Sequence, residues 1–353
     1  MQRKRPVPDV FDSAVDCKLL FNNATHSESS LILLRSKLVA ITQRLGVSHL
    51  KRENMLLVAS ELVSNNVKHA AGRGMVQLWK QPGRVLDLLS LDYGPGISNL
   101  TTAEEDGYST SSTLGKGLGA IRRLSDESYI YTQQLQPGQP RKWSGTAILA
   151  RFYLDAECRE AQSGFKFGLY SRSLSDDHYN GDRIYLHRSG KTLRWLHLDG
   201  LGHGEEAQAA TADLAGLLIE NDSPETILAM VDRQLNNTRG AVAITGEIDL
   251  STYNLRLSGV GDMNAHIYDQ KQFQHIAFAP GILGREHRSA NVLRTDFGKK
   301  SVILTASDGI RRNWDEANFI GLFNQHPQLI AYTLGNIMGR ISDDQSICVC
   351  AIG

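Results

Sequence analysis

Hydrophobic positions recur at helical spacing in two stretches near the start of the chain. In residues 27–46, leucine or isoleucine returns every three or four positions from Leu31 to Leu45. In residues 48–72 the same period continues, and Gly72 follows the last apolar turn. Because a period near 3.6 places these side chains on one face, the pattern predicts two amphipathic helices.

Alternation typical of strands replaces the helical period further along. A Pro-Gly pair separates the first two strand candidates, and the turn-rich stretch PGQPRKWSG separates the next two. The expected strands are 75–81, 84–94, 128–134 and 145–154, with a short helix at 119–127. We therefore expect residues 11–155 to fold as an α/β sandwich with an antiparallel sheet.

The second half of the chain holds many strand patterns and few helical ones. The strand candidates are 165–174, 182–190, 192–200, 240–250, 253–261, 266–270, 301–309 and 346–353, and the helix candidates are 204–220, 223–235 and 327–338. This pattern predicts a β-sandwich flanked by helices over residues 164–353. The expected fold class is α+β in two domains, with a flexible tail at 1–10 and a linker at 156–163.

Composition and charge narrow the classes of function. The chain has 353 residues, and its 38 basic residues balance 38 acidic ones, which argues against general nucleic-acid binding. No apolar run reaches the roughly 18 residues of a membrane span, and the basic start lacks the apolar core of a secretory signal. We therefore expect a cytoplasmic protein with neither nucleic-acid nor membrane partners.

Only two of the cysteines, Cys348 and Cys350, lie close together in the sequence. One intervening residue would put both on one face of a terminal strand. Zinc sites usually space their cysteines by two to four residues and supply four ligands. Buried strand cysteines in a reducing compartment are therefore the favoured interpretation.

A carboxylate and an amide share one face of the second expected helix. Glu61 and Asn65 are four residues apart, so both side chains point the same way. Asn65 offers a carbonyl oxygen to Mg²⁺, and Glu61 can polarise a hydroxyl or a water. The alternative is a solvated helix face.

Two glycine-rich segments follow. Asp92 ends an apolar strand, and Gly94 and Gly96 would let a flat base approach the backbone while Asp92 accepts a hydrogen bond from an exocyclic amine. A plain turn is the alternative. The triplet Gly115, Gly117 and Gly119 precedes a helix, where backbone N–H groups can cradle phosphates.

Taken in order, these motifs and Gly145–Thr146 resemble the Bergerat ATP-binding fold of histidine kinases and anti-sigma-factor kinases. The segment DGYSTSSTLGKGLGAIRRLSDE is most similar to the RsbT branch of switch kinases. The resemblance implies phosphorylation of a serine or threonine on a STAS-domain protein, with ATP and Mg²⁺. It implies that Glu61 is the general base, that Asn65 holds Mg²⁺ and that Asp92 binds adenine. The other residues that it assigns to the pocket and its lid are Gly94, Gly96, Gly115, Lys116, Gly117, Gly119 and Thr146, and Lys116 fits a solvated lysine equally well.

Acidic residues stand at strand ends or turns at four places in the second half. They are Asp182, Asp199, Asp308 and the pair Asp343 and Asp344. Strands can bring such carboxylates into one cleft, where hard oxygen ligands suit Mg²⁺ or Mn²⁺ and two metals can activate a water for attack on a phosphate. Each Asp-Gly pair is also compatible with an ordinary turn.

A histidine-based metal site is the other alternative, from His187, His197 and His203. The order of the acidic motifs, however, resembles the SpoIIE and RsbX branch of metal-dependent (PPM-type) serine/threonine phosphatases, from about residue 164 to the end, and a complete domain is expected. That resemblance implies two Mn²⁺ or Mg²⁺ ions, with Asp199 bridging both. The implied ligands are Asp182, Asp199, the carbonyl of Gly200, Asp308 and Asp343. Asp343 is preferred to Asp344 by its place in the motif D-D-x-S.

Together the resemblances imply a bifunctional partner-switching regulator. Its first domain would phosphorylate a STAS-domain anti-sigma-factor antagonist, its second would remove the phosphate, and a ligand or partner would bias the ratio. A downstream effector or sigma regulator is a further expected partner. The alternatives are a phosphatase whose kinase-like domain senses ATP or docks the partner, and a binding module that acts by contact.

Overall fold

The structure, a computed structural model, describes residues 14–15, 17–100, 117–135, 138, 142–155, 164–270 and 272–353. The expected tail 1–10, the linker 156–163 and two lid residues, Gly115 and Lys116, lie outside the described residues. The chain divides into two compact units. The first, here the N-terminal unit, comprises Cys17–Glu160 and Trp314–Thr333; the second, the C-terminal unit, comprises Met1–Asp16, Ala161–Asn313 and Leu334–Gly353.

The N-terminal unit is built on a five-stranded antiparallel sheet in the order β1-β2-β3-β5-β4. Its strands are β1 (Lys18–Ala24), β2 (Gly74–Gln81), β3 (Val85–Asp92), β4 (Glu127–Gln133) and β5 (Gly145–Tyr153). Its helices in the first half of the chain are α1 (Ser30–Arg44), α2 (His49–Ala70) and α4 (Gly117–Leu124). Strand β1 was not expected, because its sequence KLLFNNA carries two asparagines and a bulge interrupts its register.

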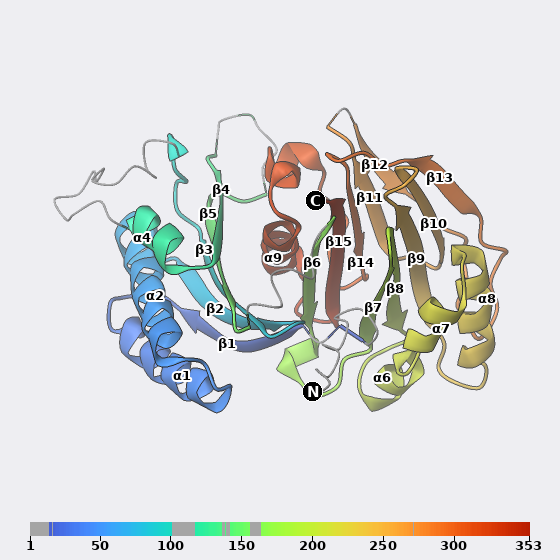
Figure 1. Cartoon of the computed structure of the whole chain (residues 1–353), viewed down its shortest axis with the longest axis horizontal. Helices are drawn as coiled ribbons and strands as arrows, with labels where there is room; N and C mark the ends of the chain where they lie inside the picture. Colours follow the sequence, from blue (N-terminus) through green and yellow to red (C-terminus); the bar gives the residue numbers. More distant parts are fainter. Residues whose placement is uncertain are drawn as a thin grey trace, which may run out of the picture. The chain divides into compact units, whose positions relative to one another are not determined.

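Helices α1 and α2 lie along one face of this sheet (Figure 1). Their apolar positions pack on the alternate strand residues that point the same way; the fully buried members include Leu34, Leu38, Met55, Leu62, Leu78 and Leu88. Ser48 caps α2 by accepting the N–H of Lys51, and α2 ends where Ala71 adopts a left-handed backbone. The two predicted helices and the antiparallel sheet are therefore confirmed.

The opposite face of the same sheet is covered by the segment Trp314–Thr333, which the sequence had assigned to the second domain. The ring of Tyr332 lies 5.1 Å from that of Trp79 on β2. On β4, the side chain of Gln133 donates to the carbonyl of Asn318 at 2.9 Å and accepts the N–H of Ile320 at 3.0 Å. Side chains therefore bury both faces of this sheet.

The C-terminal unit contains two five-stranded antiparallel sheets, in the orders β13-β10-β9-β8-β7 and β12-β11-β14-β15-β6. The strands are β6 (Phe165–Arg172), β7 (Asp182–Ser189), β8 (Thr192–Gly200), β9 (Ala241–Asp249), β10 (Asn254–Val260), β11 (Asn264–Tyr268), β12 (Phe273–Ile276), β13 (Val292–Asp296), β14 (Val302–Ala306) and β15 (Gln345–Ile352). His197 on β8 contacts Thr305 on β14 and Ser346 on β15, so the two sheets pack face to face.

Helices cover the outer face of the sheet that contains β8, as Figure 1 shows. They are α6 (Glu205–Thr211), α7 (Ala215–Glu220) and α8 (Pro224–Leu235). The single helix expected at 204–220 is wrong in one respect, because Asp213 takes a positive φ of 57° and separates α6 from α7. A fourth helix, α9 (Pro327–Met338), continues from the N-terminal unit into the C-terminal unit.

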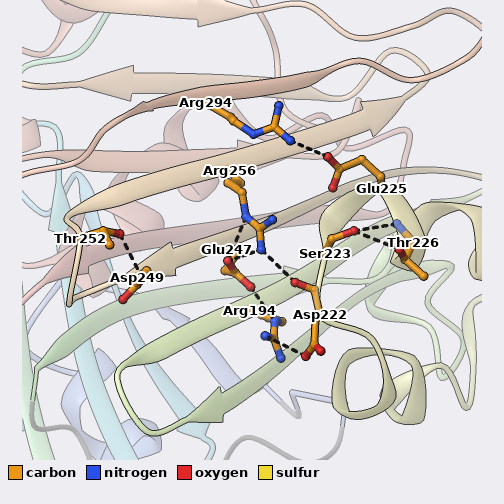
Figure 2. A network of polar contacts seen from close by, with 10 residues as sticks. All are labelled: Arg194, Asp222, Ser223, Glu225, Thr226, Glu247, Asp249, Thr252, Arg256 and Arg294. Atoms are coloured by element: carbon orange, nitrogen blue, oxygen red, sulfur yellow. Dashed lines mark hydrogen bonds and ion pairs between the residues drawn. The ribbon is translucent and has the colours of Figure 1, made fainter.

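A polar network ties the start of α8 to this sheet (Figure 2). Glu247 on β9 accepts hydrogen bonds from Arg194 on β8 at 2.7 Å and from Arg256 on β10 at 2.6 Å. Arg256 also donates to the carbonyl of Asp222, just before α8, at 2.9 Å. The network orders the loop that leads into the helix.

Cys348 and Cys350 are buried on β15 with their sulfur atoms 3.8 Å apart, as expected for strand cysteines. The α+β fold class in two parts is confirmed. Within the described ranges, we find no helix with both the length and the apolar character that crossing a membrane requires.

Candidate active sites

Helix α2 holds Glu61 and Asn65 one turn apart, next to the start of α4. A Cβ atom built on Gly117 would lie 3.3 Å from both Glu61 Oε2 and Asn65 Oδ1. The absent side chain at Gly117 therefore lets the first turn of α4, which also contains Gly119, approach the carboxylate and the amide closely. Free N–H groups at this helix start favour anions such as phosphate.

Two adjacent asparagines on α2 play different parts. Asn66 is 2% exposed; its amide donates to Thr25 Oγ1 at 3.1 Å and accepts from Ser90 Oγ at 3.0 Å. Asn65 is only half-buried and takes no part in these bonds. The fold therefore uses Asn66 for packing and leaves the amide oxygen of Asn65 available for a ligand.

Asp92 lies at the end of β3, and its Oδ1 accepts the N–H of Gly94 at 2.7 Å and of Thr146 at 3.2 Å. Burial raises the pKa of Asp92, although these two backbone hydrogen bonds oppose the rise. Both bonds go to Oδ1, so among the described residues Oδ2 remains available. An exocyclic amine could donate to it.

Glycines let three chain segments meet around Asp92. A Cβ on Gly145 would lie 2.1 Å from the carbonyl oxygen of Asp92, and one on Gly96 would lie 2.5 Å from that of Gln133. Gly96 also has a φ of 78°, which other residues rarely adopt. The structure therefore brings the predicted site residues of this unit together in two groups. One contains Glu61, Asn65 and Gly117, and the other contains Asp92, Gly94, Gly96 and Thr146.

The second candidate site lies where strands of the C-terminal unit begin and end. Asp182 opens β7 and is the register partner of Asp199 near the end of β8. The N–H of Asp308, just beyond β14, donates to Asp199 Oδ2 at 3.3 Å. Three of the predicted ligands therefore meet at one end of the sandwich. The charge of Asp343 contributes to the raised pKa of Asp199 and of Asp308, and that of Asp344 to the raised pKa of Asp182.

The electrostatics of this cluster favour a cation. Burial, followed by the charges of Asp182, Asp308 and Asp343, raises the pKa of Asp199 to about 9. Burial also raises the pKa of Asp182 to about 7, although hydrogen bonds from Ser307 and Ser346 oppose the rise. Burying several carboxylates together is costly unless positive charge accompanies them.

A hard divalent ion fits this donor set by its chemistry, since the predicted ligands are carboxylate oxygens and one backbone carbonyl. Gly200 follows Asp199, and a Cβ there would lie 2.7 Å from the carbonyl of Ala207. Over the part of the chain that the structure describes, no three Asp, Glu, His or Cys side chains are already arranged around a common metal position. Binding an ion would therefore require these carboxylates to turn toward it.

The structure distinguishes the two adjacent aspartates near the C-terminus. Asp344 is 3% exposed, and its two oxygens accept the N–H groups of Leu174 and Gly181, each at 2.7 Å. Asp343 is half-buried, and among the described residues its Oδ1 accepts the N–H of Asp344, at 3.0 Å. Asp344 is thus occupied with fixing loops, whereas Asp343 has oxygen to spare for a ligand.

Sequence reasoning missed a buried chain of side chains behind Asp182. Ser346 Oγ donates to Asp182 Oδ2 at 2.7 Å, and His197 Nε2 lies 2.7 Å from the same Oγ. Thr305 Oγ1 lies 2.9 Å from His197 Nδ1. Burial lowers the pKa of His197 to about 3, so the ring is neutral and donates from Nε2 to Ser346. Only the serine of the motif D-D-x-S hinted at this chain.

The three histidines do not form a metal set. His197 is enclosed between the sheets with both nitrogens engaged, His187 is half-buried on β7, and His203 is exposed ahead of α6. The alternative of a histidine-based site is therefore not supported by their positions.

Residues 25–139 match the histidine kinase-like ATPase domain family. The serine/threonine-protein kinase RsbT of Bacillus subtilis (strain 168) is 33% identical over 90 residues, which cover 25% of this chain and 67% of RsbT.

Three solved structures are similar to this chain, each with a TM-score below 0.5. A chain from work on the bacterial stressosome as a modular system adapted to secondary messenger signaling has 25% identity and a TM-score of 0.49, covering 53% of this chain and 98% of its own. RsbX in complex with magnesium has 19% identity and a TM-score of 0.48, covering 54% of this chain and 96% of RsbX. The PP2C phosphatase domain with a regulatory fragment of SpoIIE from Bacillus subtilis has 15% identity and a TM-score of 0.45. The match covers 92% of this chain and 94% of the SpoIIE chain.

Proposed function

Because the chain belongs to the family of RsbT-like serine/threonine-protein kinases, with a histidine kinase-like ATPase domain, we propose that its N-terminal unit phosphorylates a serine or threonine of a STAS-domain protein. The observation that carries this proposal is the approach of Gly117 to Glu61 and Asn65, with the open carboxylate oxygen of Asp92 in the same unit.

The roles of the residues follow from their chemistry. ATP with Mg²⁺, when bound, supplies the phosphoryl group. Asn65 would hold the metal through its amide oxygen, and Asp92 would accept from the adenine amine through Oδ2. Glu61 would accept the proton of the substrate hydroxyl, and the N–H groups at the start of α4 would orient the phosphates.

For the C-terminal unit we propose removal of phosphate from serine or threonine of the same class of partner. The convergence of Asp182, Asp199 and Asp308 carries this proposal. Two Mn²⁺ or Mg²⁺ ions, when bound, supply a nucleophilic hydroxide at neutral pH. Asp199 would bridge them, Asp182, Asp308, Asp343 and the Gly200 carbonyl would complete the set, and Ser346 and His197 would hold Asp182 in place.

Opposed activities on one site would only hydrolyse ATP unless something biases their ratio. We therefore propose that the protein is a partner-switching regulator in which binding of a ligand or partner changes the balance of the two rates. The likeness to RsbT supports a STAS-domain protein as the shared substrate.

The test follows the intact mass of a STAS-domain protein incubated with the chain, ATP, Mg²⁺ and Mn²⁺. We expect phosphate to accumulate with the Asp199→Asn variant, to stay low with the wild type, and to be absent when Glu61→Gln is added to Asp199→Asn. The matched control is Glu53→Gln, an exposed glutamate on the same helix that should leave phosphorylation unchanged.

The outcomes separate the alternatives. If Asp199→Asn never yields phosphoprotein but the wild type removes phosphate from a pre-phosphorylated partner, the chain is a phosphatase with an ATP-sensing or docking domain. If neither activity appears, a module acting by contact gains support, and retained binding of the partner by the Glu61→Gln, Asp199→Asn double variant would identify it.

A further inference from the structure

A recess of about 490 Å³ opens on the C-terminal unit beside two of the aspartate loops. The described residues that line it are Arg311, Arg312, Asn313, Arg340, Ile341 and Ser342. Three of them are arginines and, within the described chain, none is acidic. Because the whole chain has a formal net charge of zero, this recess is a local concentration of positive charge.

The backbone holds the two arginine-bearing loops together. The N–H of Arg311 donates to the carbonyl of Met338 at 2.9 Å, and the N–H of Arg340 donates to that of Gly309 at 2.8 Å. A Cβ at Gly309 would lie 1.8 Å from the carbonyl of Asp344, so only glycine permits this approach. These bonds fix the backbones of Arg311 and Arg340 next to each other, on loops that also carry Asp308 and Asp343.

The recess adjoins the carboxylate cluster, because the charges of Arg340 and Arg312 lie near enough to oppose the rise in the pKa of Asp308. Its lining, as far as the chain is described, contains none of the five proposed metal ligands. Arg312 pairs with Asp262 at 3.2 Å, but both side chains are largely exposed. Exposed ion pairs contribute little, so a stronger anion can displace Asp262. Planar guanidinium groups bind carboxylate and phosphate oxygens in pairs.

We propose that this recess binds an oxyanion that the phosphoprotein substrate carries next to the phosphate being removed. The oxyanion is a carboxylate of an acidic segment or a second phosphate, which present the same chemistry to arginine. Asn313 and Ser342 offer polar contacts, and Ile341, 92% exposed, offers an apolar one to the substrate chain. The inference rests on the proposed phosphatase function.

The test compares phosphoserine peptides that differ only in their flanks: asparagine and glutamine, aspartate and glutamate, or a second phosphoserine. The full chain with Mn²⁺ should show a kcat/KM about tenfold higher for one or both anionic flanks than for the neutral flank, as one to two charge-assisted hydrogen bonds allow. Which flank is preferred identifies the source of the oxyanion. Equal rates on all three peptides would overturn the inference.

Variants locate the preference. The Arg311→Gln, Arg340→Gln double variant should lose it while still hydrolysing p-nitrophenyl phosphate, a substrate that has no flank for the recess to bind. Arg285→Gln, Arg288→Gln removes the same charge from exposed positions outside the lining and should keep the preference. Retention of the preference by the double variant in the recess would also refute the inference.

A binding measurement is independent of turnover. With Asp199→Asn, fluorescence anisotropy should give about tenfold tighter binding of an anionic-flank peptide than of the neutral one, and the two arginine substitutions should abolish the difference. A wild type that is inactive even on p-nitrophenyl phosphate would remove the proposed function itself. Activity on that substrate without a preference for anionic flanks would refute only the role proposed for the recess.

Discussion

The hydroxyl of Tyr332 donates a hydrogen bond of 3.0 Å to Oδ2 of Asp87, although 245 residues separate the two in the chain. Asp87, on β3, also forms a two-pronged ion pair with Arg151 on β5, with both N–O distances at 2.8 Å. All three side chains are at most 3% exposed. The contact therefore joins the segment Trp314–Thr333 to a buried charged pair within the N-terminal unit.

Replacing Tyr332 by Phe should lower the free energy of unfolding by about 1–2 kcal/mol, because the substitution leaves the ion pair but removes a buried hydroxyl that two partners use. Those partners are Asp87 and Gln81. Thermal unfolding would measure the loss. The control is Tyr253→Phe, at a tyrosine 42% exposed, which should shift the midpoint little. Equal shifts in both variants would contradict this role.

The stability of the N-terminal unit should fall sharply when one member of this ion pair is removed without the other. Asp87→Leu should destabilise the N-terminal unit by about 3–5 kcal/mol, because it leaves the guanidinium of Arg151 buried and unpaired. Adding Arg151→Met should recover much of that loss, since two apolar side chains tolerate this environment. Denaturant midpoints of the two single variants and the double variant test it. A double variant less stable than either single one would be the wrong result.

Substitutions at Asp343 and Asp344 should affect different properties: metal binding at Asp343 and stability at Asp344. Asp344→Asn removes an acceptor from the N–H of Leu174 or Gly181. It should therefore lower the free energy of unfolding, measured with a chelator present, by about 1–3 kcal/mol. Asp343→Asn should leave that free energy nearly unchanged but weaken Mn²⁺ binding, measured by calorimetry. The reverse pattern would make Asp344 the ligand.

His266 on β11 should make the C-terminal unit less stable in acid. The ring is 5% exposed and stacks on Phe273, and burial, with a smaller effect from the charge of His275, lowers its pKa to about 4. Below the unfolded value of about 6.5, the unfolded chain gains a proton that the folded chain excludes. Stability is therefore fully present above about pH 6.5 and is lost as pH falls toward 4.

The full effect approaches about 3 kcal/mol, from 1.4 kcal/mol per unit of pKa. It appears as the difference between the wild type and His266→Phe, because other groups titrate equally in both. Unfolding curves at intervals from pH 7.5 to pH 4 measure it. A constant difference over this range would show that His266 is not kept neutral by the fold.

Sequence periodicity located most elements because their patterns are local. Helix α2 has a cap, an apolar stripe and a stop, β8 mixes apolar with polar residues in the way of a strand, and β14 opens with three apolar residues. Strand β13 escaped because only hydrogen bonds to β10, more than thirty residues away, define it. Asp213 broke an otherwise continuous helical pattern by a local backbone conformation.

Residue type and spacing predicted side chains that the structure brings together, such as Asp182 and Asp199, while their roles stay predictions. Which of Asn65 and Asn66 is free depends on contacts with Thr25 and Ser90, which no local pattern contains. The same holds for the role of His197, since its partners come from two strands of the facing sheet. Long-range packing decided what spacing alone left open.

The path of the chain through Trp314–Thr333 has a consequence for how such a protein can be divided or rebuilt. This segment interrupts the C-terminal unit between the loops of Asp308 and Asp343, and its side chains complete the core of the N-terminal unit. A cut between residues 155 and 164 yields a first fragment without Tyr332, whose ring lies against that of Trp79. Recombination that exchanges only the first half of the chain would likewise leave this segment without the sheet that it covers, so both halves must be inherited together.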